Sequence, residues 1–361
     1  MRLAVLGPSL NFEKGSYILK SLAEGLSLLD SRIEVYPVGY HDIVLFGAHR
    51  FRSNSSSLYR VLFPKVYKLS SRRGFKYLKL LVETTSFVKF ILKNFDCILL
   101  SVTALSYPGV IKLTQHYFPM ILWDIDSPYI PYLIYSQYIN EDRHVLLCYS
   151  KGGCDLWRRY GVNSVFFPLA CDTTLFYPTK SQTKNIPILF TGRYLRDRLE
   201  GYKKFLYPLV HRFGKKVVIV GSGWESNQIV KNARVINGLP YWLLNTLYNM
   251  ARICINIHRD NSRRTHTALN LRTFEIMGSG QICITDRVSG IEELFQPDDD
   301  IIVCDDANEM LANVEKILND DPLRAKIARA GYNKILQAHT IKHRAIQLIK
   351  ILEKHGYLSV D

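Results

Sequence analysis

The sequence predicts an α/β fold of two Rossmann-like domains, each built on a parallel sheet, that face each other across a cleft. Short apolar runs alternate with amphipathic stretches along the chain. A polar stretch bounded by prolines interrupts this alternation at residues 178–187, after which it resumes. Strand–helix–strand repetition is typical of parallel sheets with right-handed crossovers. Because 361 residues suffice for two domains, we expect a first domain at residues 1–175 and a second from residue 176 onward.

The elements of each domain follow from this pattern. In the first domain a helix is expected at about 15–29, basic helices in the fifties to nineties, and strands or short apolar segments at residues 2–6, 33–38, 42–46, 97–102, 120–123, 145–149 and 165–168. In the second domain strands are expected at residues 188–191, 217–220, 235–237, 253–257, 282–285 and 301–304. Gly278 and Gly280 end the helix that carries Arg272, since glycine accepts the left-handed conformation that closes a helix.

The composition is that of an ordinary globular protein. Hydrophobic residues make up 47% and charged residues 22%, and the opening residues 1–7 are too short for a signal-peptide core. The apolar stretch at 87–100 is interrupted by Lys89, Lys93 and Asp96, so no transmembrane segment is expected. The seven cysteines form no C-x-x-C pair, which argues for reduced thiols in the cytoplasm and against a cysteine metal site.

Positive charge is concentrated in one segment of the first domain. Residues 50–93 hold eleven Lys or Arg against the single acid Glu83, a local net charge of +10 out of +15 for the chain. Aromatic residues are interleaved with these cations. Two interpretations stay open: a solvated helical face, or a contact surface for an anionic partner such as nucleic acid, an envelope polymer or a lipid surface. The second interpretation makes Arg72, Arg73 and Lys76 acceptor-side candidates and allows association with the membrane or the nucleoid.

Two motifs of the second domain predict a phosphate site. The run T-G-R-Y-L-R-D-R directly follows a strand, so backbone N–H groups near Gly192 can approach phosphate while Arg193, Arg196 and Arg198 supply bidentate donors. The run V-G-S-G-W places Gly221 after the next strand, a weaker signal, because a G-x-G often makes only a tight turn. On the helix that follows Ala268, Arg272 can meet phosphate, and Glu275, one turn later, can accept from sugar hydroxyls.

Three further positions are expected at the cleft. His258 and Arg259 end a strand and should face it, although a lone histidine at a strand end is more often structural. Gly7 ends the first strand, where the backbone can touch donor or acceptor.

The run W-D-I-D-S-P carries the catalytic candidates of the first domain. A strand delivers Asp124 and Asp126 to its C-terminal end, the edge at which doubly wound sheets place ligands. A carboxylate there can take the proton from an acceptor hydroxyl. Asp126 would orient Asp124 or cap a helix. Tyr129 begins a series of tyrosines with a spacing of three residues, which indicates core packing or a stacking platform.

The order of motifs resembles a known family. R-x-F-E-x-M-x-x-G at residues 272–280, then E-x-L-F at 292–295 and H-T-x-x-x-R at 339–344 resemble the donor half of GT-B glycosyltransferases, most closely the CgeB (spore maturation protein)-like family. The D-I-x-x-P context of Asp124 is similar to that of the catalytic aspartate in phage DNA β-glucosyltransferases. The resemblance implies a second domain at 176–338 that binds the nucleotide-sugar and a helix at 339–361 that returns to the first domain.

The resemblance also implies the chemistry. A nucleotide-sugar, with a UDP-sugar preferred, would serve as co-substrate, and no cofactor would be bound permanently. Glu275 would bind the ribose, and the turn with Leu239 would contact the base or serve only as a turn. Asn270, Leu271 and Arg272 belong to the same donor motif.

Thr267 stands where many retaining GT-B enzymes carry a glutamate, so the resemblance implies inverting, metal-independent transfer with Asp124 as base. Hydroxymethylated DNA is the acceptor that the phage resemblance implies, and a protein or envelope polymer the one that the CgeB resemblance implies. The alternative from another class is an inactive GT-B fold that binds nucleotide or nucleic acid.

Overall fold

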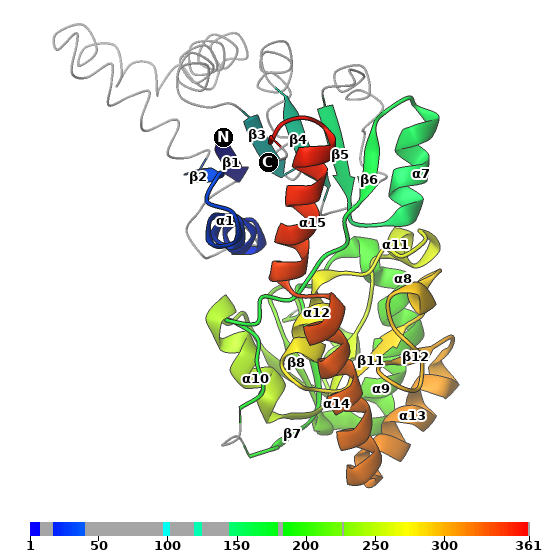
Figure 1. The fold of residues 1–361 in the computed structure, drawn as a ribbon. Helices are drawn as coiled ribbons and strands as arrows, with labels where there is room; N and C mark the ends of the chain where they lie inside the picture. Colours follow the sequence, from blue (N-terminus) through cyan, green and yellow to red (C-terminus); the bar gives the residue numbers. More distant parts are fainter. Residues whose placement is uncertain are drawn as a thin grey trace, which may run out of the picture.

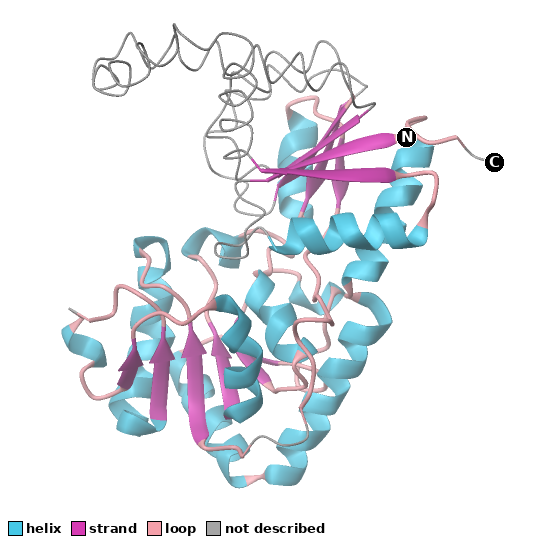
Figure 2. Cartoon of the chain, turned by 90° about the vertical axis from the view of Figure 1, so that its left-hand side faces the viewer, coloured by secondary structure: helices cyan, strands magenta, loops and turns pink. Residues whose placement is uncertain are grey.

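The computed structural model describes residues 1–7, 17–39, 97–101, 119–124, 144–179, 183–225 and 227–359. These residues form two parallel sheets in separate domains (Figure 1, Figure 2). The sheet of the N-terminal domain has the order β2-β1-β3-β4-β5-β6, and that of the C-terminal domain has the order β12-β11-β10-β7-β8-β9. Every strand pair is parallel, as the sequence predicts for a doubly wound fold.

The described part of the N-terminal domain consists of a sheet and two helices. Its strands are β1 (Arg2–Gly7), β2 (Glu34–Gly39), β3 (Cys97–Ser101), β4 (Met120–Asp124), β5 (His144–Cys148) and β6 (Ser164–Phe166). Its helices are α1 (Tyr17–Leu29) and α7 (Lys151–Arg159). Every residue of β4 and β5 is buried, which explains why these strands are apolar runs without alternation. The predicted segment at 42–46 and the basic segment at 50–93 lie outside the described residues.

The C-terminal domain is described almost completely. Its strands are β7 (Ile186–Thr191), β8 (Val217–Val220), β9 (Arg234–Ile236), β10 (Ala251–Asn256), β11 (Cys283–Asp286) and β12 (Ile302–Cys304). Its α-helices are α8 (Leu199–Gly201), α9 (Tyr207–Phe213), α10 (Leu244–Met250), α11 (Asp260–Arg264), α12 (Leu271–Gly278), α13 (Ala307–Asn319) and α14 (Asp321–Ala338), followed by α15 (Ile341–Lys354). A π-helix, η3 (Tyr202–Leu206), connects α8 to α9, and the 3-10 helices are η2 (Arg196–Arg198), η4 (Gly214–Lys216), η5 (Gln228–Val230), η6 (Tyr241–Leu243) and η7 (Ile291–Glu293). All predicted strands in the described ranges are present, with ends displaced by at most two residues.

Both faces of the second sheet are covered, because alternate residues of each strand enter different cores. Ile188 and Phe190 of β7 pack with residues of α9 and α13, whereas Leu189 between them joins a core that includes α12, α15 and α1. The core that contains Leu189, α12, α15 and α1 therefore spans the two domains. Burial of these side chains stabilises the fold by roughly 1.5–3 kcal/mol each.

The end of the chain connects the two domains. Figure 1 shows α15 in red, running from the C-terminal domain up to α1. An added Cβ at Gly25 of α1 would lie only 3.4 Å from the Cβ of Ala345, so the two helices pack closely there. Before α15, the Cys171 N–H donates to the His339 carbonyl at 2.8 Å and the Ile341 N–H to the Cys171 carbonyl at 3.0 Å. These two bonds tie the link between the domains to the start of the last helix.

The H-T-x-x-x-R motif lies at this junction. Arg344 donates from Nε to the Pro168 carbonyl at 2.7 Å and from Nη2 to His339 Nδ1 at 3.0 Å. Thr340 caps α15 by accepting from the His343 N–H. Burial lowers the pKa of Arg344 to about 10. The structure therefore assigns these residues to the joint between the domains and not to the donor cavity.

His339 makes a testable contribution to acid sensitivity. Burial, reinforced by Arg344, lowers its pKa to about 3. The unfolded chain therefore takes up the proton first as the pH falls, and the stability present above pH 6.5 is lost as the pH drops from 6.5 toward 3. The loss amounts to at most about 1.4 kcal/mol per pH unit. In His339→Gln the amide can still donate to the Leu294 carbonyl, but it does not titrate. We therefore expect the free energy of unfolding, measured by urea between pH 7 and 5, to fall less steeply with falling pH in this variant. An unchanged pH slope in the variant would contradict the assignment.

Candidate donor-binding site

A cavity of about 700 Å³ opens at the carboxyl edge of the second sheet. The strand order reverses between β7 and β10: from β7 the sheet continues through β8 to β9 on one side, and from β10 through β11 to β12 on the other. The cavity lies near this reversal, the switch point at which doubly wound folds bind ligands. Its walls come from the ends of β7 and β8, from the turn before η6, from α10 and from the start of α12. They comprise Thr191, Gly192, Arg193, Arg198, Val220, Gly221, Ser222, Gly238, Leu239, Tyr241, Leu244, Tyr248, Asn270, Leu271, Arg272 and Glu275.

Two glycines make the floor of the cavity a bare backbone. Gly192 and Gly221 both have φ of 155°. A Cβ on Gly221 would lie 2.1 Å from the Gly192 carbonyl oxygen, and one on Gly192 would lie 3.1 Å from Nη2 of Arg272. No side chain fits at Gly221, and any side chain at Gly192 would press on Arg272. The floor thus lets a ligand approach the main chain, as phosphate sites require.

Three arginines give the cavity a positive charge. Arg193 is exposed, whereas Arg198 is only 9% exposed. Arg198 donates to the Ile257 carbonyl at 3.0 Å and Arg272 to the Thr191 hydroxyl at 3.0 Å. The Arg272 guanidinium also lies 5.9 Å from the centre of the Phe190 ring. Burial and the nearby Arg272 lower the pKa of Arg198 to about 10. Among the described residues neither Arg198 nor Arg272 has a carboxylate within ion-pair distance, so an anionic ligand would relieve their repulsion.

Glu275 is held by two tyrosine hydroxyls. Its side chain is 5% exposed and accepts from Tyr241 at 2.8 Å and from Tyr248 at 3.3 Å. The Tyr248 hydroxyl also lies 3.0 Å from Thr191 Oγ1, the atom that accepts from Arg272. A continuous chain of hydrogen bonds therefore joins the carboxylate to the arginine. This chain fixes the spacing between the two groups.

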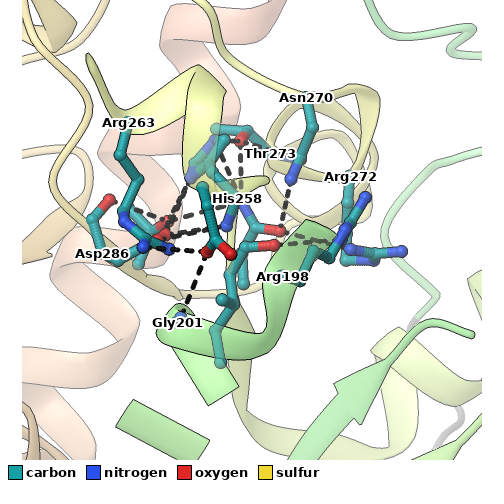
Figure 3. Close-up of polar contacts among 12 residues, drawn as sticks. Arg198, Gly201, His258, Arg263, Asn270, Arg272, Thr273 and Asp286 are labelled. Carbon is teal, nitrogen blue, oxygen red and sulfur yellow. Dashed lines mark hydrogen bonds and ion pairs between the residues drawn. The ribbon is translucent and has the colours of Figure 1, made fainter. Parts of the chain in front are cut away.

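A second layer of polar residues lies behind Arg272 (Figure 3). The Asn270 side chain caps α12 by accepting from the Thr273 N–H and donates to Asn256 Oδ1 at 3.0 Å. Asn256 donates in turn to Thr273 Oγ1 at 3.0 Å. The helix that carries Arg272 and Glu275 is thereby anchored to the end of β10.

The expectation that His258 faces the cleft is wrong. The ring is fully buried and lies outside the cavity wall, with Nδ1 2.8 Å from Asp286 Oδ1. Burial alone would raise the pKa of Asp286, but His258 and Arg263 outweigh it and lower the pKa. Arg263 lies 3.5 Å from Asp286 and 2.9 Å from Asp260. The His258–Asp286 pair thus joins the carboxyl ends of β10 and β11 (Figure 3).

Other predicted donor residues also lie away from the wall. Arg259 forms an ion pair with Asp197 at 3.2 Å, and Arg196 is exposed outside the lining. Gly7 ends β1 in the other domain, paired with Gly39. The predicted residues that the cavity does bring together are Gly192, Arg193, Arg198, Gly221, Leu239, Asn270, Leu271, Arg272 and Glu275.

Of the catalytic and acceptor-side candidates in the first domain, only Asp124 lies among the described residues. It ends β4 at the carboxyl edge of its sheet, is 1% exposed, and its carbonyl accepts from the Tyr149 N–H at 3.2 Å. It does not line the donor cavity. Asp126, Tyr129, Arg72, Arg73 and Lys76 lie outside the described residues.

Thr267 contributes to the contact between the domains. It has φ of 58° and is fully buried. Its hydroxyl accepts from the Lys151 N–H at 2.8 Å, and the neighbouring His266 carbonyl accepts from the Gly152 N–H at 3.1 Å. The first turn of α7 is therefore bound directly to the loop that precedes the donor helix α12.

Comparisons with known proteins identify the fold. Residues 196–350 match the model of a family described as glycosyl transferase-like. Sucrose-phosphate synthase from Thermosynechococcus elongatus superposes with a TM-score of 0.68 at 12% identity, over 99% of both chains. The fold is GT-B. Anabaena HepE in complex with UDP-glucose gives a TM-score of 0.68 at 11% identity, over 98% of this chain and 100% of HepE. T4 phage β-glucosyltransferase with UDP-glucose gives a TM-score of 0.62 at 11% identity, over 99% of this chain and 100% of the T4 enzyme.

These findings confirm the predicted GT-B fold of two parallel-sheet domains. No curated protein matches the chain significantly, and the closer resemblance to CgeB stays a prediction. Among the described residues, no helix is both long and apolar enough to cross a membrane. Nor do three or more His, Cys, Asp or Glu side chains gather as a metal-binding group in those parts of the GT-B fold.

Proposed function

We propose that this protein is a glycosyltransferase that moves a sugar from a UDP-sugar to an acceptor hydroxyl. The observation that carries the proposal is the pair of the buried Arg198 and the half-buried Arg272, which lacks a carboxylate partner among the described residues and borders a cavity with a backbone floor. Such a pair matches a diphosphate, whose charge it would neutralise and whose oxygens it would bind through several N–H groups.

The donor would lie along the chain of hydrogen bonds. Its diphosphate would meet Arg198 and Arg272 above Gly192 and Gly221, its ribose would meet Glu275, and its base would meet the turn at Leu239. The cavity volume of about 700 Å³ is within the range of roughly 300–1,000 Å³ for small-molecule sites. HepE and the T4 enzyme, which share the fold, have been solved with UDP-glucose.

For the reaction we propose inversion with Asp124 as the general base. The acceptor oxygen forms a bond to the anomeric carbon while the bond from that carbon to the diphosphate oxygen breaks. The acceptor proton goes to the Asp124 carboxylate, and the electron pair of the broken bond stays on the UDP leaving group, where Arg198 and Arg272 stabilise its charge. Asp126 would orient the base. Because the arginines stabilise the leaving group, this mechanism requires no metal ion.

For the acceptor, the charge of residues 50–93 favours an anionic polymer, and DNA is the specific candidate. The T4 protein of the same fold is named as a DNA-modifying enzyme. A protein or envelope acceptor would follow instead from the CgeB resemblance. In either case the donor half performs the same chemistry.

Isothermal titration of nucleotide-sugars tests the proposal. We expect UDP-glucose to bind in preference to GDP- and TDP-glucose. Glu275→Ala should weaken that binding by about 1–3 kcal/mol, since it removes a charge-assisted hydrogen-bond acceptor. Glu315→Gln, an exposed carboxylate on α13, serves as the control and should bind normally. If no nucleotide-sugar binds the unmodified protein, the GT-B fold is inactive here; if Glu275→Ala binds normally, Glu275 is not a ribose ligand.

A further inference from the structure

A second cavity, of about 450 Å³, borders the donor cavity at Tyr241, which lines both. Its walls come from the link between the domains and from η6 and α10. They comprise Thr174, Leu175, Phe176, Tyr177, Tyr241, Trp242, Asn245 and Thr246. Tyr241 lines both cavities, whereas the arginines of the donor site line only the first. The second cavity is thus a neighbour of the donor site with different chemistry.

The wall of this cavity is aromatic and uncharged. None of its eight lining residues carries a charge, although the chain as a whole carries +15. Trp242 is 71% exposed and Tyr177 is 46% exposed. Behind them, the Phe176 ring packs edge-on against Tyr241 at 5.6 Å between ring centres. Exposed aromatic faces at a cavity mouth mark a binding surface for a ligand with an apolar face.

Polar groups in the same wall have unused hydrogen-bonding capacity. Asn245 is buried, and its Oδ1 accepts from the Tyr177 N–H at 3.1 Å and from Ser279 Oγ at 2.8 Å. Asn249 Nδ2 also donates to this oxygen at 3.1 Å, and the three donors fix the amide so that Nδ2 points away from them. Within the described part of the chain, Nδ2 of Asn245 and the hydroxyl of Thr246 form no hydrogen bond, and both residues line the cavity.

We propose that this second cavity binds a neutral sugar ring. The apolar C–H face of a pyranose would stack on Trp242 and Tyr177, while its hydroxyls would meet Asn245 Nδ2 and Thr246. Because none of the eight described lining residues is cationic, the cavity disfavours phosphorylated or acidic ligands. This inference goes beyond the donor reaction, because no step of the proposed transfer uses the cavity. Since the Tyr241 hydroxyl donates to Glu275 at 2.8 Å, an occupant that touches the Tyr241 ring would also touch the support of Glu275.

Intrinsic fluorescence reports on this site selectively. The chain has four tryptophans, and Trp123, Trp157 and Trp224 are buried, so acrylamide quenching reports mainly on Trp242. We expect maltose and cellobiose to protect Trp242 from quenching, and glucuronic acid to protect it far less. By calorimetry, Trp242→Ala and Thr246→Val should each bind the protecting disaccharide at least about tenfold more weakly. Ile229→Ala, which alters an exposed apolar residue elsewhere, should bind it normally.

The outcomes separate this inference from the proposed function. Failure of both neutral disaccharides to protect Trp242 at concentrations well above about 1 mM, where binding free energies fall to about −4 kcal/mol, would overturn the sugar site. Equal protection by UDP alone would also overturn it, because Trp242 would then belong to the donor cavity. If a disaccharide protects Trp242 but no nucleotide-sugar binds, the sugar site stands and the donor proposal fails.

Discussion

Asp124→Asn is expected to bind UDP-sugar normally and to lose sugar transfer by about 10²–10⁴-fold, the usual contribution of a general base. The substitution keeps the shape of the buried side chain at the end of β4 and removes only its ability to take a proton. Donor affinity should not change, because Asp124 does not line the donor cavity. Transfer rates and calorimetric donor titrations of the same preparation measure the two effects separately.

Asp155→Asn is a matched control, because Asp155 is an exposed carboxylate on α7 of the same domain. It should retain full activity. Full activity in Asp124→Asn would instead transfer the role of base to Asp126 or indicate retention of configuration. Determination of the product anomer by NMR distinguishes these two cases, since a single displacement with a base inverts the anomeric centre.

The sheets were predictable because their strands are local features of the sequence. A strand that is buried on both faces, such as β4 or β8, must be an apolar run, and the polar residues around it mark its ends. The glycines and arginines of the cavity were predictable for the same reason. Gly192 and Arg193 follow β7 directly, Arg198 ends the 3-10 helix η2 a few residues later, and the carboxyl ends of neighbouring parallel strands meet at one edge.

The support of Glu275 was not predictable. Tyr241 and Tyr248 lie 34 and 27 residues away from the glutamate along the chain, among 22 tyrosines. The one available signal for Tyr241 was its position directly after the turn that contains Leu239. Thr191 was part of the T-G-R motif, but its side chain contributes through Arg272 and Tyr248, which no local pattern reveals.

His258 was misplaced for a related reason. A histidine that follows a strand at the ligand-binding edge is a reasonable cleft residue, yet its partner Asp286 is at the end of the neighbouring strand β11. The parallel register that pairs Asn256 with Thr285 brings these two side chains together. The buried Asp286 carboxylate also accepts from the His258 N–H at 3.0 Å and lies 3.5 Å from Arg263, and these contacts offset its desolvation. Neither the register nor the pairing can be obtained from the sequence of one strand.

Arg198→Met is expected to stabilise the fold and to impair donor binding at the same time. A buried guanidinium without a carboxylate partner in the described structure costs stability, and a methionine of similar length removes that cost. Replacing buried charge by an apolar side chain often raises stability, here by about 1–2 kcal/mol. Loss of a charged hydrogen-bond donor to diphosphate should weaken UDP-sugar binding by about 2–3 kcal/mol, or roughly 30- to 150-fold.

Arg193→Met is the matched comparison, because Arg193 borders the same cavity but is exposed. It should weaken donor binding less than Arg198→Met does and should not raise the thermal midpoint, since water already solvates its charge. Thermal unfolding without ligand, together with calorimetric titration of UDP-glucose, gives both quantities. A lower midpoint for Arg198→Met with unchanged donor affinity would make Arg198 a structural residue held by the Ile257 carbonyl. The opposite changes, a higher midpoint and lost affinity, are what a preorganised diphosphate site requires, because its charge is kept buried for the ligand at the expense of the fold.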